Sequence, residues 1–106
     1  MRFPMLMQVW SYQISHRLLV FRSYEKEGDT TATEIEFVGV VGMKTRSSYR
    51  SLTLQEVESD REMQDLVNIP DRLSHRFRRI RLLDGEEPAG FVVCGNVRVR
   101  EVPLGY

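Results

Sequence analysis

Residues 33–43 read Thr-Glu-Ile-Glu-Phe-Val-Gly-Val-Val-Gly-Met, the most regular alternation of polar and apolar side chains in the chain. Successive side chains of a β-strand point to opposite faces of a sheet, so this pattern predicts one strand with Ile35 and Phe37 facing a core. The same pattern predicts that Glu34 and Glu36 face water. We therefore expect a sheet with one buried face and one wet face.

Other segments repeat this strand signal. Apolar residues recur at every second position, or on both faces, in residues 5–14, 17–24, 49–57 and 91–102. Polar turn residues separate these segments. In the last segment, Gly95 is expected to bend one long strand without changing its register, so that Phe91, Val93, Val97 and Val99 share a face.

Residues 59–70 break the pattern. Ser59 stands three residues before Glu62, which is typical of a capping box, and Pro70 ends the run. We predict a short helix over residues 60–68. It would lie on the sheet through three apolar side chains at helical spacing: Met63, Leu66 and Val67.

Residues 72–83 allow two interpretations. As a helix, they would align Leu73, Phe77 and Ile80; as a strand, they would bury Ile80 and Leu82. We favour a strand over residues 77–83, because the turn at Asp84 and Gly85 then leads into the next strand.

Six to seven strands and one short helix predict a mainly β fold, either an antiparallel β-sandwich or a half-open barrel. The length of 106 residues suits a single domain over residues 1–106.

Composition excludes several classes of protein. Fifteen basic residues balance fifteen acidic residues, so no whole-molecule field attracts nucleic acid or an anionic membrane. One cysteine, Cys94, cannot form an internal disulfide, and with two histidines it is too little for a structural zinc site. No apolar run approaches the ~20 residues that cross a bilayer. We expect a cytoplasmic protein without metal or cofactor, in which Cys94 is a reduced, buried thiol.

Charge is uneven along residues 58–81. Residues 58–71 hold five acidic residues and one arginine. The next ten residues hold no acidic residue and five arginines: Arg72, Arg76, Arg78, Arg79 and Arg81. The two blocks could neutralise each other as surface ion pairs. Alternatively, the arginines could contact a protein partner or the phosphates of a nucleic acid.

The first two predicted strands are apolar on both faces. Trp10 and Tyr12 lie on one side of the first strand, and Met5, Met7 and Val9 lie on the other. Either both faces are covered inside the core, or one face meets another chain, where Trp, Tyr and Met are favoured. The second interpretation predicts self-association, as a homodimer.

No catalytic pattern is present. The chain lacks Gly-x-Ser-x-Gly and phosphate-binding glycine motifs. Ser15-His16 and Ser74-His75 are sequence neighbours, whose side chains would point to opposite faces of a strand. Cys94 lies in an apolar strand, which favours a structural role. We expect no enzymatic activity.

Three segments carry a resemblance. Residues 10–19 (Trp-Ser-Tyr-Gln-Ile-Ser-His-Arg-Leu-Leu), residues 35–37 (Ile-Glu-Phe) and residues 90–95 (Gly-Phe-Val-Val-Cys-Gly) resemble short uncharacterised bacterial proteins. The resemblance implies a bacterial source and a compact β fold, and it implies no activity.

The combined expectation is a non-enzymatic protein-interaction domain, such as an immunity-like protein or an accessory subunit. Its interaction residues would be Trp10, Tyr12 and the five arginines of residues 72–81. The alternative is a nucleic-acid-binding domain that uses the same arginines.

Overall fold

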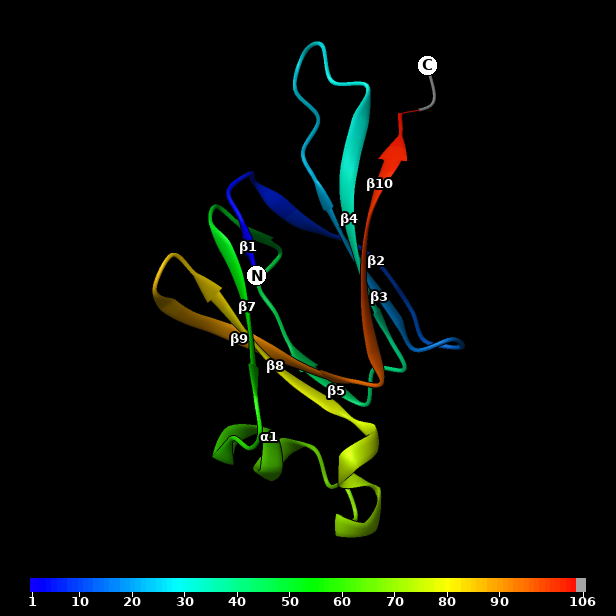
Figure 1. Ribbon diagram of the computed structural model, residues 1–106, viewed down its shortest axis with the longest axis vertical. Coiled ribbons are helices and arrows are strands. Elements are labelled where there is room, and N and C mark those ends of the chain that lie inside the picture. Colours follow the sequence, from blue (N-terminus) through cyan, green and yellow to red (C-terminus); the bar gives the residue numbers. More distant parts are fainter. Residues whose placement is uncertain (105–106) are drawn as a thin grey trace.

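Two antiparallel sheets of five strands each build the protein (Figure 1). The computed structural model describes residues 1–104. Sheet A has the order β1 (Arg2–Phe3), β7 (Leu52–Val57), β8 (Arg78–Asp84), β9 (Glu87–Cys94), β5 (Gly42–Lys44). Sheet B has the order β10 (Asn96–Pro103), β4 (Thr31–Val38), β3 (Leu18–Ser23), β2 (Met7–Gln13), β6 (Ser48–Tyr49). The predicted mainly β, antiparallel fold is confirmed.

Residues 1–104 form ten strands rather than six to seven. Three segments predicted to be single strands are each divided between the two sheets, and β1 was not predicted. The strand predicted over residues 33–43 is β4 in sheet B followed by β5 in sheet A. The strand predicted over residues 49–57 is likewise shared between β6 and β7, although Leu52 and Leu54 face the core as expected.

The strand predicted over residues 91–102 is divided at Gly95. β9 ends in sheet A and β10 begins in sheet B, so the expected common face is wrong. Phe91 and Val93 lie on the outer side of sheet A, whereas Val97 packs between the sheets. The chain passes from one sheet to the other after β4 and again after β9, and these two points are in contact: the Gly95 amide donates to the Val38 carbonyl at 2.8 Å. Gly39, which follows β4, has a φ of 69° that few other residues adopt without strain.

Aromatic side chains fill the space between the sheets. Phe21 meets Phe37 edge to face at 5.4 Å between ring centroids, and it stacks on Tyr49 at 5.8 Å. The Tyr49 hydroxyl donates to the Ala89 carbonyl at 2.7 Å, which ties β6 of sheet B to β9 of sheet A. Cys94 is buried in the same core, as expected.

Two short helices cover the outer side of sheet A. The predicted helix exists, but α1 spans only Arg61–Leu66, and its N-terminal cap is Asp60 rather than Ser59. Met63 is buried as predicted, whereas Leu66 is 65% exposed. Val67, at which the backbone is already extended, packs against the cluster around Met63 as predicted.

The ambiguous residues 72–83 are resolved in favour of a strand. β8 begins at Arg78, and a 3-10 helix, η1 (Asp71–Arg76), precedes it. Both helices of the part that the structure describes are too short to cross a membrane.

Candidate functional site

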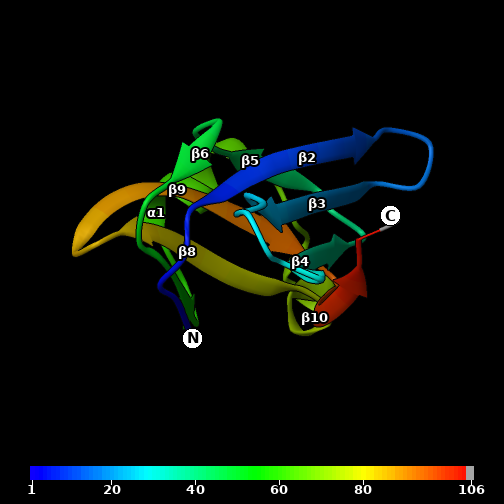
Figure 2. The same cartoon turned by 90° about the horizontal axis from the view of Figure 1, so that it is seen from above.

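The outer half of β2 is an unpaired sheet edge. β2 pairs with β6 only at Met7 and Gln8, and the Val9 amide donates to the Ser47 carbonyl at 2.9 Å. Beyond Val9, nothing in residues 1–104 pairs with this side of β2. The β2–β3 hairpin also projects away from sheet A (Figure 2). We call residues 10–14, which are the last four residues of β2 and Ile14 of the turn that follows, the β2 edge.

Large apolar side chains stand on the β2 edge. Trp10 is 52% exposed, Tyr12 is 38% exposed and Ile14 is 80% exposed. Residues 7–16 contain no Asp, Glu, Lys or Arg, in a chain that is 28% charged. The structure thus brings Trp10 and Tyr12, the two aromatic residues predicted for interaction, together on one exposed edge.

A β-bulge at Trp10 sets the faces of the β2 edge. Val9 lies opposite Phe21, Ser11 lies opposite Val20, and Trp10 is the extra residue between them. Tyr12 lies opposite Leu19 and so stands on the inner side of sheet B. Trp10 stands on the outer side, so the prediction that Trp10 and Tyr12 share a face is wrong.

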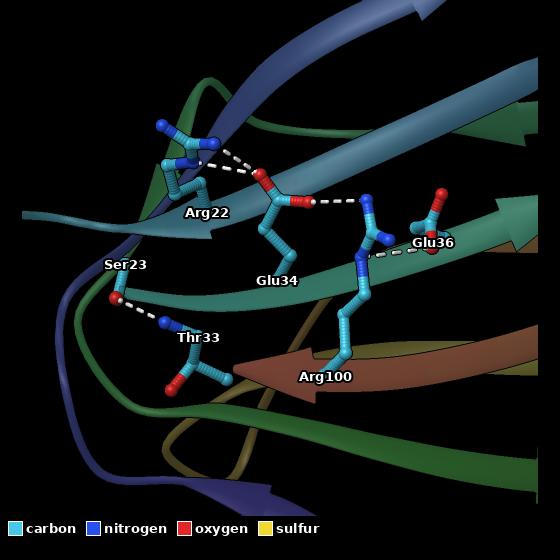
Figure 3. A network of polar contacts seen from close by, with 6 residues as sticks. All are labelled: Arg22, Ser23, Thr33, Glu34, Glu36 and Arg100. Carbon is cyan, nitrogen blue, oxygen red and sulfur yellow. Dashed lines mark hydrogen bonds and ion pairs between the residues drawn. The ribbon is translucent and has the colours of Figure 1, made fainter. Parts of the chain in front are cut away.

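Trp10 adjoins a network of charged residues on the outer face of sheet B. The guanidinium carbon of Arg22 lies 4.3 Å from the Trp10 ring centroid. The Arg22 Nε donates to Glu34 Oε2 at 2.8 Å, and Arg100 bridges Glu34 Oε1 and Glu36 Oε1 at 3.4 and 3.3 Å (Figure 3). Arg98 adds a contact to Glu36 at 3.6 Å.

Glu34 and Glu36 do not face water as predicted. They are 5% and 7% exposed, because arginines from the neighbouring strands β3 and β10 lie against them. Arg22 and Arg100 stand directly opposite Glu34 in the sheet. Cross-strand pairs of opposite charge stabilise a sheet, so this network holds β3, β4 and β10 in register beside the β2 edge.

The other edge of sheet B is protected. β10 offers eight residues of free edge, but it carries Arg98 and Arg100 and ends at Pro103. Charged residues and proline discourage the pairing of one edge strand with another. The β2 edge has neither a charged residue nor a proline, so it is the less protected of the two edges against pairing with another strand.

The five arginines of residues 72–81 do not form one surface. Arg72 and Arg76 are exposed on η1. On β8, Arg78 shares the inner side of sheet A with Ile80, whereas Arg79 and Arg81 share the outer side.

Two of the β8 arginines are engaged by carboxylates. Arg78 pairs with Glu56, and Arg81 pairs with Asp60, each at 2.7 Å. The hydrogen bonds from these arginines lower the pKa of Glu56 and of Asp60. Asp60 belongs to the acidic block, so the pair with Arg81 is one of the expected contacts between the two blocks.

The residues considered for catalysis belong to three different elements: His16 lies in the turn between β2 and β3, His75 in η1 and Cys94 at the end of β9. His16 and His75 are both exposed and far apart in the chain. Burial raises the pKa of the Cys94 thiol to about 11, so the thiol stays protonated at neutral pH and is a poor nucleophile. The described part of the chain also contains no group of three His, Cys, Asp or Glu side chains that could hold a metal ion.

Known proteins give no guide to this surface: no protein-family model, curated protein or solved structure matches the chain. The resemblance of residues 10–19, 35–37 and 90–95 to bacterial proteins therefore stays a prediction. The surface has to be interpreted from its own chemistry.

Proposed function

We propose that the protein is a non-enzymatic, cytoplasmic interaction domain that self-associates as a homodimer through the β2 edge. The observation that carries the proposal is the unpaired and uncharged run of residues 10–14, which exposes Trp10, Tyr12 and Ile14. Unpaired backbone groups at a sheet edge are a template for another strand, and exposed aromatic side chains add apolar area to the contact.

A second copy fits this edge without repulsion. A two-fold axis through Tyr12 would place Tyr12 opposite its copy and Ser11 opposite Gln13, so that no charged residues meet. A two-fold axis through Val99 of β10 would instead place Arg98 of each copy opposite Arg100 of the other. Like charges directly opposite destabilise a strand pair, so charge favours β2.

The dimer would extend sheet B across both copies. Its outer face would then carry two Trp10 side chains, each beside an Arg22–Glu34 pair. Trp and Arg are the residue types most enriched in the energetic centres of protein interfaces. An immunity-like protein or an accessory subunit would use such a surface to bind a second, different protein.

A charge swap tests the dimer and its register. In the S11K/Q13K variant, the lysine introduced at position 11 of each copy would face the lysine introduced at position 13 of the other. In the matched S11K/Q13E variant, that lysine would face a glutamate instead. Sedimentation equilibrium up to about 1 mM protein should show a dimer for the native chain and for S11K/Q13E, and a monomer for S11K/Q13K. A native monomer at every concentration, or equal behaviour of the two variants, contradicts the proposal.

The same instrument tests the nucleic-acid alternative. Arg78 and Arg81 already hold carboxylates, which leaves fewer charges for phosphates. Adding single-stranded DNA at low salt should leave the sedimenting mass unchanged. A complex that disappears in an R72Q/R76Q variant would favour nucleic-acid binding instead.

A further inference from the structure

Arg79 is a cation without a carboxylate partner in residues 1–104. Among the arginines of β8, Arg78 and Arg81 are paired, but no carboxylate oxygen of the described residues lies within 4.0 Å of the Arg79 guanidinium. Its hydrogen bonds go to Ser74, where Nη2 donates to Oγ at 2.8 Å and Nη1 donates to the carbonyl at 3.4 Å. The guanidinium therefore keeps N–H groups for another acceptor.

The neighbours of Arg79 within sheet A are apolar, whereas Glu58 and Asp71 line a second, more open hollow beside it. In sheet A, Arg79 stands between Val57 and Val93. Both belong to the hydrophobic cluster around Met63 on the outer side of the sheet. A charge in such a setting loses hydration and regains the free energy only when a counter-ion or hydrogen-bond acceptor reaches it.

A hollow of about 330 Å³ opens onto Arg79 between α1, η1 and sheet A. Its polar lining comes from Arg79, Ser74, Gln64, Asn68 and Asp71. The hollow thus combines one guanidinium without a carboxylate, neutral hydrogen-bonding groups and one acidic residue on the exposed start of η1. The volume is sufficient for a small organic molecule.

We propose that this hollow binds a carboxylate group through Arg79. A guanidinium offers two parallel N–H donors that match the two oxygens of a carboxylate. Asp71 lines the same hollow and offsets part of the attraction of Arg79 for each negative charge on a ligand. The site therefore lacks the excess of positive charge that suits a dianion such as phosphate, and we take a singly charged carboxylate as its ligand. The carboxylate could belong to a free metabolite or to the side chain or C-terminus of a protein partner.

An acetate titration tests the site. In nuclear magnetic resonance, acetate should shift the Arg79 Nε–H signal with saturation in the millimolar range and leave Arg72, exposed on η1, unchanged. Inorganic phosphate should give no saturable shift on the native chain and a saturable one on D71N. Equal, unsaturating shifts at Arg79 and Arg72 would overturn the proposal, as would phosphate binding tighter than acetate on the native chain.

A stability measurement without ligand gives a second test. The R79M variant removes the charge of Arg79 and keeps an unbranched side chain. If that charge is uncompensated, the midpoint of thermal unfolding should rise in R79M. The R72M variant, at an exposed arginine, should leave the midpoint unchanged. Acetate should then raise the midpoint of the native chain and not of R79M. A lower midpoint for R79M, or an equal effect of acetate on both chains, would contradict the site.

A competition experiment with a peptide distinguishes the two possible sources of the carboxylate. An acidic peptide that displaces acetate at a concentration well below the dissociation constant of acetate indicates a protein ligand. A peptide with no advantage over acetate indicates a free small molecule. Both results depend on saturable binding at Arg79, and its absence would end the proposal.

Discussion

The guanidinium of Arg22 lies over the ring of Trp10, 4.3 Å from its centroid, while the Nε of the same guanidinium donates to Glu34 Oε2 at 2.8 Å. A cation over the face of an indole is attracted by the ring, and the carboxylate fixes where that cation stands. Trp10 is therefore oriented before any partner arrives. Less side-chain freedom is then lost on binding, which favours association.

Removing the cation should loosen Trp10. In an R22M variant, acrylamide should quench Trp10 fluorescence more strongly, and the dimer should weaken about 2- to 5-fold, since exposed cation–π contacts contribute about 0.5–1 kcal/mol. Trp10 is the only tryptophan, so the signal comes from this site alone. R50M, at an exposed arginine outside the network, is the control. Unchanged quenching in R22M would contradict the account.

Removing the charge of Glu34 should destabilise the fold more than removing the charge of an exposed acidic residue. Glu34→Gln removes the charge that Arg22 and Arg100 share in a nearly buried position, and it should lower the free energy of unfolding by about 1–3 kcal/mol. Glu62→Gln breaks the exposed pair with Lys44 and should cost less than about 1 kcal/mol. Urea unfolding of both variants measures the two costs, and equal costs would mean that the network adds no more stability than an exposed ion pair.

Alkaline pH should destabilise the fold through the core. Burial raises the pKa of Cys94 from 9.0 to about 11 and also raises the pKa of Tyr49. Above the pKa that such a group has in the unfolded chain, the unfolded state loses the proton more readily than the folded state. A rise in pH then favours unfolding. The free energy of unfolding should therefore fall from about pH 9 toward pH 11 because of Cys94, and from about pH 10 upward because of Tyr49, by up to about 1.4 kcal/mol per pH unit for each group.

Cys94→Ala provides the control for this pH dependence. The variant loses some stability at pH 7 because it leaves a small cavity, but its stability should fall less steeply above pH 9. Tyr49 remains and accounts for the residual slope. A slope identical to that of the native chain would mean that the Cys94 thiol is not responsible.

The alternation of polar and apolar side chains predicted where most strands lie in the sequence. It did not predict to which of the two sheets each strand belongs. Apolar residues or glycine occupy every second position from residue 35 to residue 43 and from residue 91 to residue 99, on both sides of Gly39 and Gly95. A change of sheet at a glycine leaves the period of two intact. For the same reason, the alternation could not show that Phe91 and Val97 pack in different clusters.

For the proposed interaction surface, the sequence pointed to Trp10 and Tyr12, but it did not reveal their geometry or that the five predicted arginines lie elsewhere, on η1 and β8. Apolar residues on both sides of residues 5–14 pointed to Trp10 and Tyr12, but a bulge adds one residue without a sequence signal of its own. The burial of Glu34 depends on Arg22 and Arg100, which are 12 and 66 residues away in the chain. Only the register of three strands brings them together.

Cross-linking through residue 12 tests the dimer most directly. A two-fold axis at Tyr12 would bring the two copies' Cα atoms to about 4.5–5.5 Å, within the range that a disulfide spans. Val99→Cys, on the β10 edge and similarly exposed, is the control. After mild oxidation, the non-reducing intact mass should be that of a covalent dimer for Tyr12→Cys and of a monomer for Val99→Cys. A monomeric Tyr12→Cys, or equal cross-linking of both variants, would contradict dimerisation through β2.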